Sequence, residues 1–185
     1  MALTKTPVCD FGKKAEDFKL KSIENKIISL NDVKGEKATL IMFICNHCPY
    51  VKAIIRDLAK DCNELKKNGI NSVAIMSNDT KNYPEDSFDN MIKFAKTNNF
   101  GEINYLIDET QEIARKYGAV CTPDFFGYNK ELKLQYRGRF RELKDLKLVS
   151  GGESDLKIAM KMISETQTGP KEQIPSMGCN IKWFN

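Results

Sequence analysis

The sequence predicts an α/β fold in which a mixed central β-sheet is covered by helices on both faces. Residues 38–45 and 70–77 are two nearly continuous apolar stretches, a pattern typical of strands buried on both faces. Between them, apolar residues recur at spacings of three and four from Ile54 to Leu65, as on the inner face of an amphipathic helix. A strand, a helix and a second strand in this order imply a right-handed parallel crossover.

Further strands are expected on either side of this unit. Residues 18–22 and 27–30 flank a turn and predict a β-hairpin, followed by a short helical turn capped by Asn31 and Asp32. Residues 105–108 predict another strand. Residues 125–128 and 132–137 predict an antiparallel pair around Asn129 and Lys130, which makes the sheet mixed.

Three more helices are predicted, at residues 85–98, at 109–117 and around residues 156–163. Gly118 is expected to end the second of these, and Ser154 to cap the third. The apolar residues expected on the inner faces of the first and third are Phe88, Met91, Ile92 and Ala95, and Leu156, Ala159, Met160, Met162 and Ile163.

The length of 185 residues is that of one domain with a sizeable core. Residues 18–168 contain all the predicted elements and form the expected core. Residues 1–17 are mostly polar and are expected to form a surface arm. Residues 169–185 contain two prolines and no periodicity, and are therefore expected to form a C-terminal tail.

The composition, 41% hydrophobic and 29% charged, is that of a soluble globular protein. A net charge of +4 is too small to indicate a nucleic-acid partner, and the basic cluster at Arg137, Arg139 and Arg141 is interpreted as a solvated strand edge. The first residues lack an apolar stretch of signal-peptide length, so we expect no secretion signal, and no apolar run reaches the ~18 residues of a membrane span. We therefore expect a cytoplasmic protein without a membrane partner. In such a compartment, six cysteines indicate redox chemistry, metal binding or buried thiols.

The candidate site is the CxxC motif formed by Cys45 and Cys48. Its spacing is compatible with a redox pair, with half of a zinc site or with chance. Its position favours a redox pair, because Cys45 ends a predicted buried strand and Cys48 begins a predicted helix, with Pro49 in the first turn. The start of a helix stabilises a thiolate. Between the cysteines, a protonated His47 would favour the Cys45 thiolate and make the pair more oxidising, unless His47 is a solvent-exposed spacer.

A second candidate element is Cys121, Thr122 and Pro123, just before a predicted strand. The Thr-Pro pair predicts a cis-proline loop that faces the thiols, with an ordinary trans turn as the alternative. An exposed backbone at this loop could pair with an extended substrate segment. Cys121 either modulates the redox pair or is a buried, inert thiol.

The sequence resembles the peroxiredoxin-like group of the thioredoxin superfamily, which is related to the alkyl hydroperoxide reductase/thiol-specific antioxidant proteins. The strings that carry the resemblance are residues 42–51, 83–86, 117–126, 136–139 and 178–183. The resemblance implies a thioredoxin fold, here with an N-terminal β-hairpin extension and a C-terminal tail. It also implies an antioxidant or oxidoreductase activity with a CxxC centre.

Two departures from these families concern the site. Thioredoxins have a buried acid six residues before the first cysteine, where this chain has Thr39. Peroxiredoxins have a proline seven residues, and a threonine three residues, before the peroxidatic cysteine. If Cys48 is that cysteine, those positions hold Ile41 and Cys45. Arg137 or Arg139 could supply the guanidinium group of a peroxidase site.

The first functional hypothesis is a thiol–disulfide oxidoreductase that needs no cofactor. Cys45, expected to be the more exposed thiol, attacks a substrate disulfide, and Cys48 resolves the mixed disulfide. Thr122 and Pro123 line the substrate groove, and a cellular dithiol returns the electrons.

The second hypothesis is a thiol peroxidase. Cys48 is oxidised by a hydroperoxide and then condenses with Cys45 or with Cys179, carried back over the site by the tail. Alternatively, Trp183 and Phe184 merely pack the tail and Cys179 is inert. In a third hypothesis Cys45, Cys48, Cys121 and His47 bind a metal ion. The chain has one histidine and lacks a distal one, so no metal site is predicted.

Overall fold

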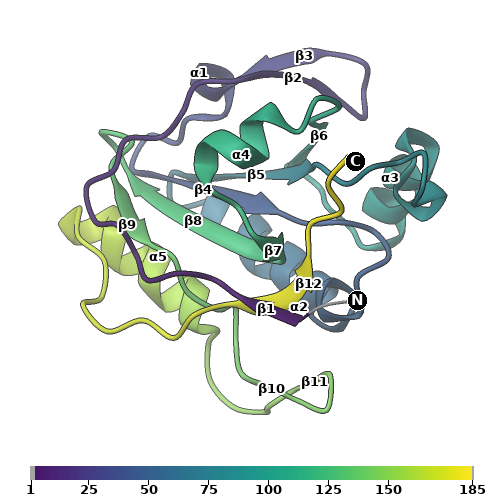
Figure 1. Ribbon diagram of the computed structural model, residues 1–185. Helices are drawn as coiled ribbons and strands as arrows, with labels where there is room; N and C mark the ends of the chain where they lie inside the picture. The colour runs from purple at the N-terminus through teal and green to yellow at the C-terminus, as the bar shows by residue number, and fades with distance from the viewer. Residues whose placement is uncertain (1–2, 185) are drawn as a thin grey trace.

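The computed structural model describes residues 3–184, and its centre is a seven-stranded mixed sheet (Figure 1). The strand order is β3-β2-β6-β5-β4-β8-β9, in which β4, β5 and β6 are parallel and the other neighbours are antiparallel. The strands are β2 (Lys19–Ser22), β3 (Ile27–Ser29), β4 (Ala38–Phe43), β5 (Ile70–Met76), β6 (Asn104–Ile107), β8 (Asp124–Asn129) and β9 (Leu134–Tyr136). The mixed sheet, its N-terminal hairpin and its parallel crossover confirm the predicted fold class.

Helices cover both faces of this sheet. The buried side chains of α2 (Pro49–Lys66), α3 (Phe88–Thr97) and α5 (Asp155–Thr166) share one hydrophobic core. Those of α1 (Leu30–Val33) and α4 (Glu112–Tyr117) belong to a second core on the opposite face. Successive side chains of β4 alternate between the two, as Leu40 and Met42 join the first core while Ile41 and Phe43 join the second. The central strand is therefore buried on both faces, as its composition predicts.

Two helices begin later than the sequence pattern predicts. The predicted helix 85–98 is a 3-10 turn, η1 (Pro84–Asp86), followed by a break at Ser87 before α3 begins. In α4 the helix starts at Glu112 because Gln111 has a left-handed backbone, with φ of 63°. The break at Ser87 has a consequence for the site, since it leaves the side chain of Asp86 free to bind outside the helix.

The structure also differs from the prediction in one helix cap and in two residues of the inner helix faces, and it agrees with the prediction of a second cap. The cap of α1 is Ser29, rather than Asn31 and Asp32, because Ser29 Oγ accepts from the Asp32 N–H and the Asp32 carboxylate accepts from the Ser29 N–H. Ile92 and Met162, predicted on inner faces, are each 38% exposed. Ser154 caps α5 as predicted, by accepting a bond from the Lys157 N–H.

The two ends of the chain meet in a small second sheet. Its strand order is β1 (Leu3–Lys5), β12 (Met177–Asn180) and β7 (Cys121–Thr122), and the three strands lie side by side in Figure 1. The predicted arm is largely exposed, but it contributes β1. The predicted C-terminal tail contains a strand that its lack of periodicity did not indicate, because its second half forms β12 and buries Cys179 and Ile181. The predicted arm and tail extend to residues 1–2 and 185, which lie outside the described residues.

Beyond these elements the structure contains a short hairpin, β10 (Leu143–Lys144) and β11 (Lys147–Leu148), between β9 and α5. Among residues 3–184, no helix has the length and apolar character needed to cross a membrane.

Candidate redox site

The CxxC motif lies in the loop that joins the central strand β4 to helix α2. The strand ends at Phe43, and the loop is held at its start by a bond from the Ile44 N–H to the Ile75 carbonyl. Cys48 is the N-cap of α2, and Pro49 occupies the first helical position, as predicted. Both cysteines are buried, since Cys45 is 1% and Cys48 0% exposed. Exposure therefore does not distinguish the two thiols, although Cys45 was expected to be the more exposed one.

The cis-proline loop faces both sulfur atoms. The Thr122–Pro123 peptide bond is cis, as predicted. Cys45 Sγ lies 3.3 Å from Thr122 Oγ1, and Cys48 Sγ lies 3.1 Å from the Thr122 carbonyl oxygen. Thr122 is thus 77 positions from Cys45 and 74 positions from Cys48 in the sequence, yet the three residues form one thiol site at the carboxyl end of β4 and the start of α2.

A third thiol belongs to this site. Cys179 Sγ lies 3.1 Å from Cys48 Sγ, because β12 pairs with β7 in a register that places Cys179 opposite Thr122. The tail was expected either to bring Cys179 to the site or only to pack through Trp183 and Phe184. In the structure it lies against the site and places Cys179 beside Cys48. The apolar tail residues also pack, since Trp183 joins the second core and lies under the guanidinium of Arg115.

The surroundings of Cys48 favour its thiolate. Hydrogen bonds from the thiols of Cys45 and Cys179 and from the N–H groups of Val51 and Cys179 lower the pKa of Cys48 to about 5, against the opposing effect of burial. The bond with Cys48, burial and the charge of Asp86 raise the pKa of Cys45. When Cys48 is protonated its S–H donates to the Thr122 carbonyl, and on ionisation the sulfur accepts bonds instead. The acidic thiol is therefore Cys48, whereas the sequence had suggested Cys45.

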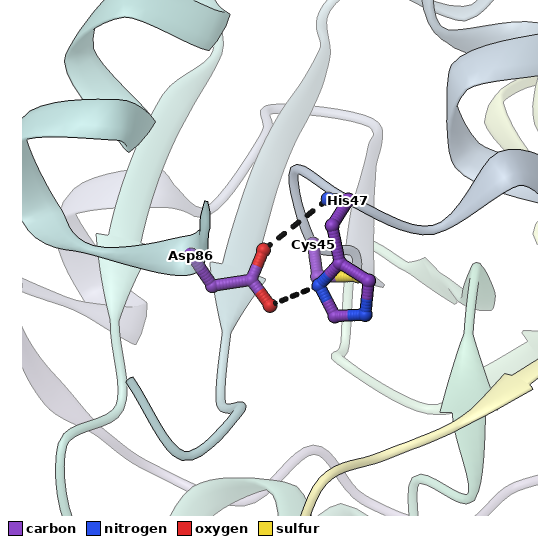
Figure 2. A group of neighbouring side chains, drawn as sticks. All are labelled: Cys45, His47 and Asp86. Atoms are coloured by element: carbon purple, nitrogen blue, oxygen red, sulfur yellow. Dashed lines mark hydrogen bonds and ion pairs between the residues drawn. The ribbon is translucent and has the colours of Figure 1, made fainter. Parts of the chain in front are cut away.

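Asp86 binds the loop between the two cysteines, and Figure 2 shows its carboxylate beside His47 and near Cys45. One carboxylate oxygen accepts from the N–H groups of Asn46, at 2.8 Å, and His47, at 3.3 Å. The other is 2.7 Å from His47 Nδ1 and accepts from the side-chain amide of Asn78 at 2.8 Å. Asp86 is 0% exposed, so a buried carboxylate holds the whole loop in place.

His47 is oriented by this carboxylate. Its hydrogen bond with Asp86 raises the pKa of the imidazole, and the desolvation of the ring opposes this shift. The ring also stacks on Tyr83, at a centroid distance of 5.6 Å and an angle of 9°. Because its side chain is 13% exposed, His47 is not the solvent-exposed spacer considered from the sequence.

Asp86 is the functional residue that sequence reasoning missed. It stands in the string of residues 83–86 that carries part of the family resemblance, but it was placed on the predicted helix 85–98. The buried acid near the thiols is thus Asp86, which lies in η1. Thioredoxins have theirs on the strand before the first cysteine, at the position that Thr39 of β4 occupies in this chain. Thr39 Oγ1 instead accepts a bond from the Gly35 N–H, at 3.0 Å.

Three side chains at this site could bind a metal ion, but the carboxylate among them is already used in hydrogen bonds. Cys45, His47 and Asp86 each place one donor atom within 4.8 Å of the others. The Asp86 oxygens, however, already accept four hydrogen bonds, one of them from the His47 ring. Cys121, expected in the alternative metal set, directs its sulfur toward the Pro123 carbonyl, at 3.6 Å. Burial raises the pKa of Cys121 well above its ordinary value, which makes it an unreactive thiol.

Neither of the arginines proposed for a peroxidase site is bound at the thiols. Arg137 is buried, pairs with Asp124 at 3.0 Å and donates to the Gly118 carbonyl at 2.7 Å. Its guanidinium lies over the ring of Phe126, so the expectation of a solvated strand edge is also wrong for this residue. Arg139 pairs with Asp155 at 2.6 Å. Arg137 thus holds the start of β8, next to the cis-proline, and Arg139 binds the start of α5, so neither guanidinium group binds a sulfur atom.

A pocket of about 420 Å³ adjoins the site beyond Pro123. Its lining includes Tyr50 and Ile54 of α2, and Met177 of β12.

The fold and the thiol-bearing loop define a thiol protein of the thioredoxin superfamily. A model of the AhpC/TSA family matches residues 11–140, and the chain belongs to this family. Family membership, together with three thiols gathered at one site, supports a thiol-based redox function. No curated protein matches the chain.

Two solved structures are similar along the whole chain. An uncharacterized conserved protein from Geobacillus kaustophilus is 39% identical, with a TM-score of 0.94 over 100% of this chain and 97% of that chain. A hypothetical protein from Sinorhizobium meliloti is 35% identical, with a TM-score of 0.90 over 98% of each chain. The thioredoxin domain of a thiol-disulfide oxidoreductase from Bacteroides vulgatus is 19% identical, with a TM-score of 0.59 over 70% of this chain and 89% of that chain, and shares the fold.

Proposed function

We propose that the protein is a thiol–disulfide oxidoreductase whose Cys45 and Cys48 cycle between dithiol and disulfide, in a reducing compartment such as the cytoplasm. The observation that carries this proposal is the geometry of the two thiols, since Cys48 is the N-cap of α2 and both sulfur atoms face Thr122 beside the cis-proline. This setting lowers the pKa of Cys48 and raises that of Cys45. A nucleophilic thiolate and a neighbouring thiol that can displace it are the two parts that disulfide exchange requires.

The reaction proceeds in two displacements. The Cys48 thiolate attacks one sulfur of the substrate disulfide, forms a mixed disulfide and releases the other sulfur as a thiolate, which takes up a proton. Cys45 loses its proton and attacks Cys48 Sγ, which forms the Cys45–Cys48 disulfide and releases the second substrate thiol. The substrate gains two electrons and two protons, and a cellular dithiol restores the reduced enzyme and gives the protein an antioxidant role.

Serine variants test this order of events with glutathione disulfide as the oxidant. In Cys48→Ser the reaction is lost, and in Cys45→Ser it stops at a glutathione adduct on Cys48 that mass spectrometry detects. Cys9→Ser, in the N-terminal arm and away from the thiols, is the matched control and reacts like the unmodified protein. Full activity of Cys48→Ser would contradict the proposal.

A thiol peroxidase is the second candidate, and the contact between Cys48 and Cys179 favours it. The Cys48 thiolate attacks the O–O bond of a hydroperoxide, which leaves a sulfenic acid on Cys48 and releases an alcohol or water. The Cys179 thiol then condenses with the sulfenic acid, and water leaves as the disulfide forms. This candidate lacks an arginine bound at the thiols.

The reaction of fully reduced protein with limiting hydrogen peroxide separates the two candidates. A fast reaction that yields a Cys48–Cys179 disulfide supports the peroxidase, and Cys179→Ser then accumulates sulfenic acid that a dimedone probe labels. A rate no greater than that of a free thiol leaves disulfide exchange as the function.

A further inference from the structure

The edge of the cis-proline loop is filled by the chain's own strand. In β12, Cys179 pairs with Thr122 and Asn180 pairs with Cys121, both in antiparallel register. Because of this pairing, the backbone that the sequence suggested was exposed for an extended substrate segment is already used. Cys179, 4% exposed, lies on this strand, with its sulfur 3.1 Å from Cys48 Sγ.

The close fit of β12 depends on Gly178. A Cβ atom added at this position would lie 2.0 Å from the Thr122 carbonyl oxygen and 3.1 Å from Pro123 Cδ. Both are parts of the cis-proline loop, and the first is backbone that cannot move aside on its own. The strand can therefore lie this close to the thiols only with glycine next to Cys179.

The strand is held at both ends and along its second edge. On that edge it pairs with β1. Before the strand, Ser176 Oγ donates to the Pro123 carbonyl at 2.8 Å. After it, the Lys182 carbonyl accepts bonds from the Asp79 N–H and the Gln111 side chain. These contacts hold β12 in place beside the thiol site, so the strand is not a loosely attached tail.

We propose that β12 restricts the thiol site to small-molecule oxidants and excludes protein disulfides. A protein segment that pairs with β7 must first remove β12 and break its bonds on both edges. A small oxidant does not need to pair with β7, so its reaction does not require β12 to be removed. The proposal rests on the redox function assigned to Cys48 and names the substrate class of that site.

The test compares two oxidants under single-turnover conditions, with reduced full-length protein. Glutathione disulfide represents small disulfides, and insulin, whose disulfides lie within folded chains, represents proteins. The unmodified protein is expected to react with glutathione disulfide at least about 100-fold faster than with insulin. Comparable rates with the two oxidants would overturn the proposal.

Gly178→Ala provides the second arm of the experiment, because its added Cβ forces β12 away from Thr122. We expect the ratio of its rate with insulin to its rate with glutathione disulfide to rise about tenfold or more. The ratio is the readout because moving Cys179 also alters the hydrogen bonds to Cys48, which affects both oxidants alike. Asn180→Ala lies on the same strand, but its side chain bonds to Lys182 and not to the cis-proline loop. It is the matched control and keeps the original preference. An unchanged preference in a Gly178→Ala variant whose circular dichroism spectrum remains folded would also overturn the proposal.

The same measurements distinguish a wrong assignment of Cys48 from a wrong role for β12. If the protein reacts with neither oxidant, or if Cys48→Ser reacts as fast as the unmodified protein, the redox function itself fails and the proposal fails with it. If reaction depends on Cys48 but insulin reacts as readily as glutathione disulfide, the redox function stands and only the role of β12 is overturned.

Discussion

Cys48 and Cys179 are 131 residues apart in the chain, yet their sulfur atoms lie 3.1 Å from each other. This separation exceeds the roughly 2.05 Å of a disulfide bond but is close enough for a hydrogen bond between the two groups. It makes Cys179 part of the electrostatic environment of Cys48, where Cys45 and the N-terminus of α2 already favour a thiolate. In turn, burial and the bond with Cys48 raise the pKa of Cys179 to about 12.

The first prediction concerns the pH at which Cys48 ionises. Absorbance at 240 nm is expected to show a thiolate with a midpoint near the pKa of about 5. The signal disappears in Cys48→Ser. In Cys45→Ala the midpoint shifts upward toward the ordinary thiol value, because the largest stabilising hydrogen bond is lost. A midpoint unchanged by the Cys45 substitution would contradict the assignment.

The same pKa shift predicts how stability depends on pH. The folded pKa of Cys48, about 5, lies below its ordinary value of 9.0. The thiolate therefore contributes stability that is fully present above pH 9 and is lost as the pH falls through 5. Urea unfolding across this range should show the unmodified protein losing stability relative to Cys48→Ser on the acid side. A difference that does not vary with pH would count against a Cys48 thiolate.

The third prediction tests Asp86 as the anchor of the thiol-bearing loop. Asp86→Asn removes the charge that holds His47 and weakens four hydrogen bonds. We expect a loss of about 1.5–3 kcal/mol in the free energy of unfolding. Asp89→Asn, an exposed position in the first turn of α3, is the matched control. Equal stability of the two variants would show that Asp86 does not anchor the loop.

A fourth prediction follows from the raised pKa of His47. Because the chain has one histidine, its imidazole gives a single set of NMR titration signals, and Asp86→Asn should lower the measured pKa. The bond between His47 and Asp86 contributes stability that is fully present below the ordinary value of 6.5 and declines as the pH rises through the folded pKa. The stability lost in His47→Asn should accordingly be larger below pH 6.5 than at an alkaline pH above the folded pKa.

The fifth prediction distinguishes a bracing role of Arg137 from a catalytic one. Arg137→Met leaves Asp124 as a buried charge without its partner and is expected to cost about 3–5 kcal/mol. Adding Asp124→Asn restores part of this loss, because the uncompensated charge is gone. Arg56→Met, on the exposed face of α2, changes stability by less than about 0.5 kcal/mol. Loss of thiol reactivity without loss of stability in Arg137→Met would instead indicate a catalytic role.

Local patterns were sufficient for most of the central fold. The apolar stretch that forms β4 and the regular spacing of Ile54, Leu58 and Leu65 describe elements whose neighbours in the sequence largely decide their structure. The boundaries of α3 and α4 were less predictable. At Ser87 and Gln111 the backbone leaves the helical conformation, and the side chains of Asp86 and Gln111 bind distant segments. No local sequence pattern indicates these contacts.

The candidate site shows the same division. Cys45, Cys48, Pro49 and Thr122 lie in short motifs whose position between strand and helix could be recognised. Asp86 could not be assigned to the site, because its bonds to His47 join segments that are about 40 residues apart. The partners of Arg137 were equally hidden, since burial beside Asp124 depends on how β8 and the loop after α4 pack.

The sequence by itself determined the order of the main strands and helices and the places of the CxxC motif and the Thr-Pro dipeptide, because these depend on local periodicity and on backbone preferences. The tertiary structure decided which cysteine is the acidic one, that Asp86 holds the loop and that β12 closes the site with Cys179. The reason is physical. The pKa of a thiol and the access to it depend on hydrogen bonds, burial and strand pairing among residues far apart in the chain, and these arise only when the whole chain has folded.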